Sequence, residues 1–375
     1  MIDPFEFLNK LESYDLTFAT GVPDSLLKDL LKALEMSWSR KSNLIVANEG
    51  NAIAVASGHY ISTRRPAIVY MQNSGLGNAV NPLVSLADPE VYSIPMLLLI
   101  GWRGEPGTKD EPQHVKQGKI TEELLQALQI PTYKIRPDSN IDNIVADANF
   151  RMISESRPVA LLISKDSFTP VNSAEIEFEE NHLTRERAIQ SIIKIVPKDT
   201  LIVCNTGMAS RELFEVRERN GDSHDFDFLT VGSMGHASSI AFGIAMNLLT
   251  RKVICLDGDG SFLMHMGASG IIAQSNVTNF LHIVINNGAH DSVGGQPTIG
   301  LQLNLEKLSK EMGYKEARSC KTDERLRYEL TSMLDLNGPN FLEIRVSKGA
   351  RRNVGRPTIS PIGNLKNFME GILVR

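Results

Sequence analysis

Oxygen-bearing side chains follow two neighbouring apolar runs in the C-terminal half of the chain. Asp259 lies in a Gly-Asp-Gly triplet directly after the run VICLD, and Asn287 is the second residue of an Asn-Asn pair after the run FLHIVI. If both runs are parallel strands joined by a right-handed crossover, their carboxyl ends lie at the same edge of a sheet. A carboxylate oxygen, an amide oxygen and a backbone carbonyl near Ala289 would then form a set of hard oxygen donors that suits Mg²⁺.

A diphosphate is the expected companion of such an ion, because Mg²⁺ held by few protein ligands completes its shell with water and phosphate oxygens. Gly258 and Gly260 allow the backbone to approach a diphosphate closely, and Ser261 lies where a helix N-terminus would present free N–H groups. Thr206 and Gly207, which follow the run LIVC, are further candidates for contact with the diphosphate. Gly-Asp-Gly is also a common turn, and only the Asn pair after the next apolar run favours the metal site.

An acidic residue in apolar surroundings marks the N-terminal half. Glu49 follows the run NLIVAN and has Ala, Val, Ile and Gly as its other neighbours. Ionising a carboxyl group in such surroundings is costly, so Glu49 can keep or share a proton. The alternative is that Glu49 only caps a helix.

Short apolar runs that alternate with helix-like stretches must position these residues. The runs are apolar at consecutive positions, which is typical of strands buried on both faces of a parallel sheet. The fold class is therefore α/β, with two tandem doubly wound parallel-sheet domains. A polar segment rich in Pro, Ser, Asn and acidic residues interrupts the alternation, so we expect domains at 1–170 and 186–375 and a linker at 171–185.

The composition excludes several classes of protein. The 375 residues are 42% hydrophobic and 22% charged, and the net charge of -5 is spread along the chain. No basic face indicates nucleic acid or a membrane as a partner. The chain begins without the pattern of a signal peptide, so we expect a cytoplasmic protein. Cys204 and Cys255 lie in apolar runs and are expected to be reduced packing residues.

The Gly-Asp-Gly triplet and the Asn pair resemble the signature of thiamine-diphosphate enzymes. The resemblance implies that Asp259, Asn287 and the Ala289 carbonyl bind Mg²⁺ and that Glu49 activates the pyrimidine ring for formation of the cofactor ylid. The segment VGSMGHASS supplies Gly232 and Ser233 as small residues near the cofactor. It also supplies Met234 at the position where related enzymes place a bulky apolar residue under the cofactor, although Met is a common core filler as well.

Longer segments resemble the phosphonopyruvate decarboxylases over nearly the full chain: GVPDSLL, NEGNA, YMQNSGLGNAVNPL, KDEPQHVKQGKIT, NNGAHDSVGGQPT and GRPTISP. This resemblance implies a pyrimidine-binding domain, then a diphosphate-binding domain, and no middle domain. It implies decarboxylation of 3-phosphonopyruvate to phosphonoacetaldehyde and CO₂ through an ylid and an enamine. It also implies a homo-oligomer, at least a dimer, with the cofactor at the subunit interface.

The substrate would be a small anionic 2-keto acid, and its second anion needs cations or strong donors. Arg103, Lys109, His114 and Lys116 lie close together in sequence, in a proline-containing segment that we expect to be a loop over the site. The alternative is a solvated charged loop.

Further candidates lie at expected strand ends, where catalytic groups collect in such sheets. Asn73 is assigned to the cofactor, Ser74 to the substrate and Asp24 to catalysis. His114 and His290 are candidates for moving protons between enamine and product.

Three rival functions are open. Sulfopyruvate decarboxylases resemble this chain, but their two domains often occur as separate chains, which favours the phosphonate enzyme. A nicotinamide-dependent oxidoreductase is disfavoured because no strand is followed by G-x-G-x-x-G with an acidic residue about twenty positions on. A non-catalytic thiamine-diphosphate binding protein should have lost Glu49, which is present here.

Overall fold

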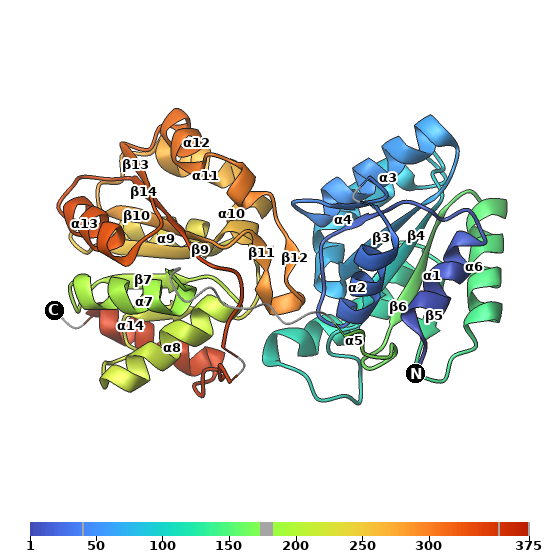
Figure 1. Ribbon diagram of the computed structural model, residues 1–375, viewed down its shortest axis with the longest axis horizontal. Helices are drawn as coiled ribbons and strands as arrows, with labels where there is room; N and C mark the ends of the chain where they lie inside the picture. The colour runs from blue at the N-terminus through green and yellow to red at the C-terminus, as the bar shows by residue number, and fades with distance from the viewer. Residues whose placement is uncertain (40, 173–182, 352, 374–375) are drawn as a thin grey trace. The chain divides into compact units, whose positions relative to one another are not determined.

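The computed structural model describes residues 1–39, 41–172, 183–351 and 353–373. The chain divides into two compact units, Met1–Glu175 and Ile176–Arg375, each built around a six-stranded parallel sheet with helices on both faces (Figure 1). The expected pair of α/β domains is therefore confirmed. The predicted linker at 171–185 includes residues 173–182, which lie outside the described residues, so its limits stay a prediction.

The sheet of the first unit has the strand order β2-β1-β3-β4-β6-β5. Its strands are β1 (Ala19–Gly21), β2 (Asn43–Ile45), β3 (Ala67–Gln72), β4 (Met96–Gly101), β5 (Thr132–Ile135) and β6 (Pro158–Ile163). Its helices are α1 (Pro4–Glu12), α2 (Lys28–Ser37), α3 (Glu49–Thr63), α4 (Leu76–Pro82), α5 (Pro112–Ala127) and α6 (Ile141–Ser154). A 3₁₀ turn, η1 (Asn73–Gly75), follows β3 directly.

The sheet of the second unit repeats this order when its strands are counted from β7: β8-β7-β9-β10-β14-β13. Its strands are β7 (Leu201–Cys204), β8 (Asp227–Leu229), β9 (Val253–Gly258), β10 (Phe280–Asn286), β13 (Glu316–Cys320) and β14 (Asn340–Arg345). Its helices are α7 (Arg185–Ile195), α8 (Met208–Asn220), α9 (Ala237–Asn247), α10 (Asp259–Met264), α11 (Gly267–Ala273), α12 (Leu305–Met312), α13 (Asp323–Leu334) and α14 (Pro361–Leu373). A short hairpin of β11 (Ala289–His290) and β12 (Gln296–Pro297) lies outside the sheet.

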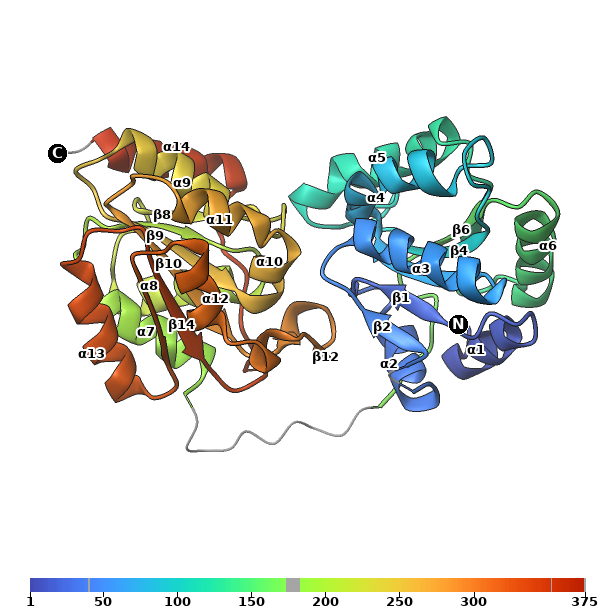
Figure 2. The same ribbon diagram turned by 90° about the horizontal axis from the view of Figure 1, so that it is seen from above.

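Alternating strand residues build a separate core on each face of the sheets. In β9, Ile254 and Leu256 pack with α7, α8 and α13, whereas Val253 and Cys255 pack with α9, α11 and α12 on the opposite face (Figure 2). The central strands are thus buried on both sides, as their continuous apolar runs predicted. Cys204 and Cys255 are free and fully buried, which confirms them as packing residues.

The prediction that the segment from Arg103 to Lys116 is a loop over the site is wrong in one respect. Residues 112–127 form helix α5, and Pro112 occupies its first turn. Proline is well tolerated there because the N–H that it lacks would have no partner inside the helix, and its fixed φ suits the helical turn. Only the part before Pro112, which includes Arg103 and Lys109, is a loop.

No helix in the described ranges combines the length and apolar character needed to cross a membrane.

Candidate active site

The Gly-Asp-Gly turn joins β9 to α10 at the carboxyl edge of the second sheet. Gly258 ends the strand and Asp259 begins the helix, which leaves the Asp259 side chain only 2% exposed. The Asn287 N–H and the Thr298 hydroxyl both donate to its carboxylate. Burial raises the pKa of Asp259 to about 6, against the effect of these donors. A cation at this position would therefore meet a carboxylate that lacks a positive partner among the described residues.

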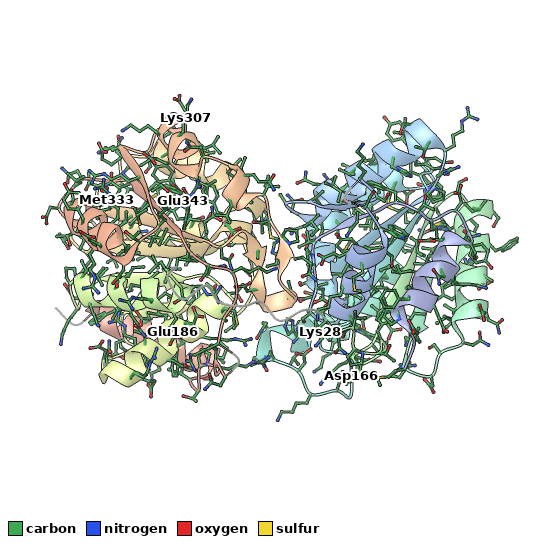
Figure 3. The ribbon with its side chains drawn as sticks, viewed as in Figure 1. Lys28, Asp166, Glu186, Lys307, Met333 and Glu343 are labelled. Atoms are coloured by element: carbon green, nitrogen blue, oxygen red, sulfur yellow. The ribbon has the colours of Figure 1, made fainter. Side chains whose placement is uncertain are left out.

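The Asn pair follows β10, which lies next to β9 in the sheet. The Asn287 side-chain amide donates to Oδ2 of Asp291 over 2.6 Å, and its Oδ1 accepts from the Ala289 N–H over 3.1 Å. The Asn286 amide likewise donates to Oε1 of Glu343 over 2.7 Å (Figure 3 labels Glu343 inside the unit). Each asparagine thus turns its NH₂ group toward a buried carboxylate, which fixes where its oxygen points.

The carboxylate that orients Asn287 belongs to a buried ion-pair network. Asp291 Oδ2 also accepts from Arg185 over 2.8 Å and from the Gly349 N–H over 3.0 Å. Arg185 in turn forms a two-point pair with Glu212, with N–O distances of 2.8 and 3.1 Å. The network joins the start of α7 and the middle of α8 to the Asn pair.

Close backbone approaches bring the expected cofactor residues of the second unit together. A side-chain carbon at Gly260 would lie 2.8 Å from Cε1 of His290 and 3.3 Å from Cε of Met234. The Ser261 hydroxyl accepts from the Gly235 N–H over 3.0 Å, which ties the α10 N-terminus to the turn that contains Met234. Gly260 therefore has to be glycine in this arrangement.

The remaining expected residues of this unit lie at the ends of β7 and β8. Thr206 and Gly207 lie just after β7, separated from it by Asn205, and Gly207 has a φ of 101° that favours glycine. Gly232 and Ser233 follow β8, and Ser233 is exposed. The strand order reverses between β7 and β9, and ligands of such sheets bind at this switch point.

The residues at this edge fit a Mg²⁺ diphosphate. Asp259, Asn287 and the Ala289 carbonyl all offer oxygen ligands, and Ala289 is buried two positions after the Asn pair. Buried Asn205 at the end of β7 keeps its Oδ1 without a hydrogen bond among the described residues, and its Nδ2 lies 3.5 Å from a side-chain carbon built on Gly258. A buried amide oxygen without a hydrogen bond, beside a glycine turn, is typical of a ligand site.

Sequence reasoning missed Asn205, Asp291 and Thr298. Asn205 ends the run LIVC just before the Thr-Gly pair that was singled out, so its position was the available signal. Asp291 and Thr298 gave no such signal, because their importance lies in contacts with the Asn pair and with Asp259. His290 was expected, and burial lowers its pKa to about 4, so its imidazole is neutral at pH 7.

Glu49 begins helix α3 of the first unit and is 5% exposed. Asn48, not Glu49, caps this helix by accepting from the Asn51 N–H over 3.0 Å. Glu49 Oε2 instead accepts from the Asn78 side chain over 2.8 Å, and a side-chain carbon at Gly75 would lie 2.4 Å from Oε1. The surroundings of Glu49 are thus less apolar than expected, because a polar amide contacts one of its oxygens.

Asp24 and His114 lie near Arg103. Asp24 follows the carboxyl end of β1, and Arg103 follows that of β4. Asp24 is fully buried, and burial raises its pKa to about 6, against the opposing charge of Arg103. Its Oδ2 has no hydrogen bond among the described residues. Burial and the charge of Arg103 lower the pKa of His114 to about 4. Burial thus shifts this carboxyl group and this imidazole toward their neutral forms.

The cationic side chains expected to bind the substrate differ in whether protein groups already pair with them. Arg103 forms a two-point ion pair with Asp110 and donates to Ser25 over 2.8 Å, so its guanidinium already has protein partners. Lys109 and Lys116 are exposed.

Asn73 and Ser74 have separate surroundings in η1. The Asn73 amide bonds the backbone of Arg103 and the Thr121 hydroxyl, which is a scaffolding contact, and Ser74 accepts from Gln72 over 2.7 Å. These assignments to cofactor and substrate stay predictions.

Comparison with known proteins identifies both units. Residues 6–127 match the family described as thiamine pyrophosphate enzyme, N-terminal TPP binding domain, and residues 205–344 match the corresponding C-terminal TPP binding domain. Thiamine pyrophosphate is another name for thiamine diphosphate. The order of the two matches is the order expected for a pyrimidine-binding domain followed by a diphosphate-binding domain.

Similar proteins cover nearly the whole chain. The chain is 31% identical over 385 residues to a phosphonopyruvate decarboxylase of Streptomyces viridochromogenes, spanning 98% of this chain and 94% of that protein. It is 31% identical over 388 residues to one of Streptomyces hygroscopicus, spanning 99% and 94%. It is 26% identical over 389 residues to a sulfopyruvate decarboxylase of Methanosarcina acetivorans, spanning 96% and 95%. The chain therefore belongs to the thiamine pyrophosphate enzyme family, among the relatives of phosphonopyruvate decarboxylase.

Proposed function

We propose that this protein decarboxylates 3-phosphonopyruvate to phosphonoacetaldehyde and CO₂ with thiamine diphosphate and Mg²⁺. The observation that carries the proposal is the 31% identity to two phosphonopyruvate decarboxylases over almost the entire length of all three chains. The oxygen donors at the carboxyl edge of the second sheet support the choice of cofactor and ion.

In this proposal Asp259, Asn287 and the Ala289 carbonyl hold Mg²⁺, and the α10 N-terminus faces the diphosphate. The bound cofactor supplies the carbon nucleophile and the electron sink that decarboxylation of a 2-keto acid requires. Glu49 holds the proton that is exchanged with the pyrimidine ring. The pKa of Asp24, raised to about 6, and the neutral imidazoles of His114 and His290 suit groups that give or take a proton near the reacting carbons.

The active unit is at least a homodimer in this proposal, with the pyrimidine-binding domain of one subunit and the diphosphate-binding domain of the other forming one site. Lys109, His114, Lys116, Arg103 and Ser74 are the candidate contacts for the substrate. Arg103 would reach the substrate only by sharing its guanidinium with Asp110.

Sulfopyruvate is the second candidate substrate, because a full-length relative from Methanosarcina acetivorans is a sulfopyruvate decarboxylase. Its sulfonate has the shape of a phosphonate but one negative charge, whereas a phosphonate carries nearly two. The two acids can therefore be separated only by the strength of the cationic site.

The test compares kcat/KM for phosphonopyruvate, sulfopyruvate and pyruvate. Pyruvate leaves the cationic groups without a partner, so we expect it to be poorer than phosphonopyruvate by roughly 10³-fold or more. Sulfopyruvate should be poorer by about tenfold for each 1.4 kcal/mol of lost charge interaction. Equal values for pyruvate and phosphonopyruvate would refute the proposal, and a preference for sulfopyruvate would select the second candidate.

Lys109→Ala, His114→Ala and Lys116→Ala locate the phosphonate contacts in the same assay. Exposed Lys41→Ala is the matched control, because Lys41 precedes β2 and so lies at the opposite edge of the first sheet. If a variant lowers kcat/KM equally for all three acids, the substituted residue does not contact the phosphonate.

A further inference from the structure

Two polar side chains at the β11–β12 hairpin lack protein partners. The Gln296 side chain is 2% exposed, yet neither its Oε1 nor its Nε2 has a hydrogen bond among the described residues. A buried amide without partners loses its hydrogen bonds to water and gains none in return, which is unfavourable. Such a group indicates a ligand that supplies the missing partner.

Lys348 is the second of these side chains. It is partly buried, and no carboxylate or other polar group in the described ranges pairs with its ammonium group. The neighbouring acid Asp291, which binds the Gly349 N–H, is already paired with Arg185 over 2.8 Å. The charge of Lys348 is therefore not balanced by this carboxylate.

The turn between the two short strands holds both side chains. A side-chain carbon at Gly294 would lie 2.7 Å from Nε2 of Gln296, and one at Gly295 would lie 3.0 Å from Cε and 3.3 Å from Nζ of Lys348. Both glycines have positive φ, 131° and 76°, so any other residue would be strained as well. The pair of glycines thus leaves space for one amide and one ammonium group against a single turn.

This turn adjoins the predicted metal centre of the second unit. The hairpin begins at Ala289, two positions after the Asn pair, and the Gly295 N–H donates to the His290 carbonyl over 3.0 Å. Lys348 precedes Gly349, whose N–H shares the carboxylate oxygen that orients Asn287. A ligand bound here would lie beside the groups assigned to the diphosphate.

We propose that Lys348 and Gln296 bind a phosphorus oxyanion of a molecule held at this centre. An ammonium group supplies a point charge for a doubly charged anion, and the amide NH₂ donates to one of its oxygens. Because the inference rests on the proposed function, the anion has two sources, the diphosphate of the cofactor and the phosphonate of the substrate. With this site, the second unit would bind the anion through its own residues and would not need the cations of segment 103–116.

The test titrates the full-length protein in Mg²⁺ buffer by calorimetry. One arm uses thiamine diphosphate, and the other uses phosphonoacetate with the cofactor already bound. Lys348→Gln removes the charge, Lys348→Arg restores it, and Gln296→Glu replaces the NH₂ donor with a carboxylate. The control is Lys307→Gln, because Lys307 projects outward from α12 (Figure 3) and is exposed.

We expect Lys348→Gln and Gln296→Glu to weaken one of the two ligands at least tenfold, Lys348→Arg to recover most of this loss, and the control to stay within twofold of the wild type. A loss for thiamine diphosphate assigns the site to the cofactor, and a loss for phosphonoacetate alone assigns it to the substrate. Unchanged affinity for both ligands in both variants would overturn the inference. If the wild type fails to decarboxylate phosphonopyruvate, the proposed function fails, while these binding arms still decide the anion site.

Discussion

At the level of single residues, Asp24 makes the stability of the folded protein depend on pH. It is fully buried, its Oδ2 lacks a hydrogen bond in the described structure, and a side-chain carbon at Gly101 would lie 2.0 Å from its Oδ1. The raised pKa, to about 6 from 3.8, means that the folded state holds this proton more tightly than the unfolded state. The stabilisation from protonation is complete below about pH 4 and is lost as the pH rises through about 6.

Asp24→Asn should therefore stabilise the protein at pH 8 relative to the wild type, and by less at pH 5. The difference between the two pH values should be about 1.4 kcal/mol, because pH 5 lies about one unit below the folded-state pKa and each unit corresponds to 1.36 kcal/mol. Urea unfolding of the first unit's transition at both pH values measures it, with exposed Glu90→Gln as the control. The assignment is wrong if the variant differs from the wild type by the same amount at pH 5 and pH 8.

Glu49 keeps its place through Asn78 and the helix start, so a change of its charge need not disturb its position. Glu49→Gln should bind thiamine diphosphate within a few-fold of the wild type, while proton exchange at C2 of the bound cofactor slows by roughly 10²-fold or more. NMR of quenched samples in D₂O measures the exchange rate. Asn78→Ala, which removes only the contact, is the matched control. If C2 proton exchange in Glu49→Gln proceeds at the wild-type rate, Glu49 does not activate the cofactor.

At the level of elements, the Arg185–Asp291 pair links the start of α7 to the turn after β10. Asp291 accepts a hydrogen bond from the NH₂ group of Asn287 and thereby fixes the orientation of this amide, whose oxygen is the predicted metal ligand. Partners of this kind fix the orientation of a ligand without touching the ion. Helix α7, which begins at the end of the predicted linker, therefore also supports the predicted metal ligand.

Asp291→Asn should lower the affinity for Mg²⁺ by about 10- to 100-fold, because the orienting carboxylate is lost while the ligands remain. The readout is the Mg²⁺ concentration that gives half-maximal thiamine diphosphate binding. Asp259→Ala should abolish the Mg²⁺ dependence, and Arg187→Met on the exposed face of α7 should leave it unchanged. A wild-type Mg²⁺ requirement in Asp291→Asn would show that Asn287 needs no such support.

At the level of the whole molecule, both units share one strand order, and each presents its expected site residues at the ends of the strands. Glu49 belongs to the first unit and Asp259 to the second. A cofactor that needs both residues must bring a unit of each kind together, and the proposed dimer does so with units from different subunits.

Mixing two inactive variants tests this arrangement. Glu49→Gln and Asp259→Ala, each inactive alone, should regain about a quarter of the wild-type activity after subunit exchange, because half of the dimers are mixed and each mixed dimer has one intact site of two. Mixing either variant with itself is the control. No recovery, with exchange verified by native mass spectrometry, would place both residues of a site in the same chain.

The sequence by itself determined the type and order of the parts. Continuous apolar runs predicted buried parallel strands because such strands meet apolar partners on both faces, and residues directly after them were predicted to lie at one edge. Asp259, Asn287, Ala289 and Ser261 were predicted as site residues in this way, since their positions depend only on where a strand ends and a helix begins. The polar strand β13 gave no such signal, because it lies at the sheet edge.

Only the tertiary structure decided how these residues are held and which charges are free. The pairing of Arg103 with Asp110, of Asn287 with Asp291 and of Asp291 with Arg185 depends on loops and helices that meet in space. Hydrophobic periodicity carries no information on such contacts, because it reports only which face of an element is buried. The same holds for Lys348, whose charge has no partner among the described residues, and for Asp291, which is engaged by Arg185 from more than a hundred positions away.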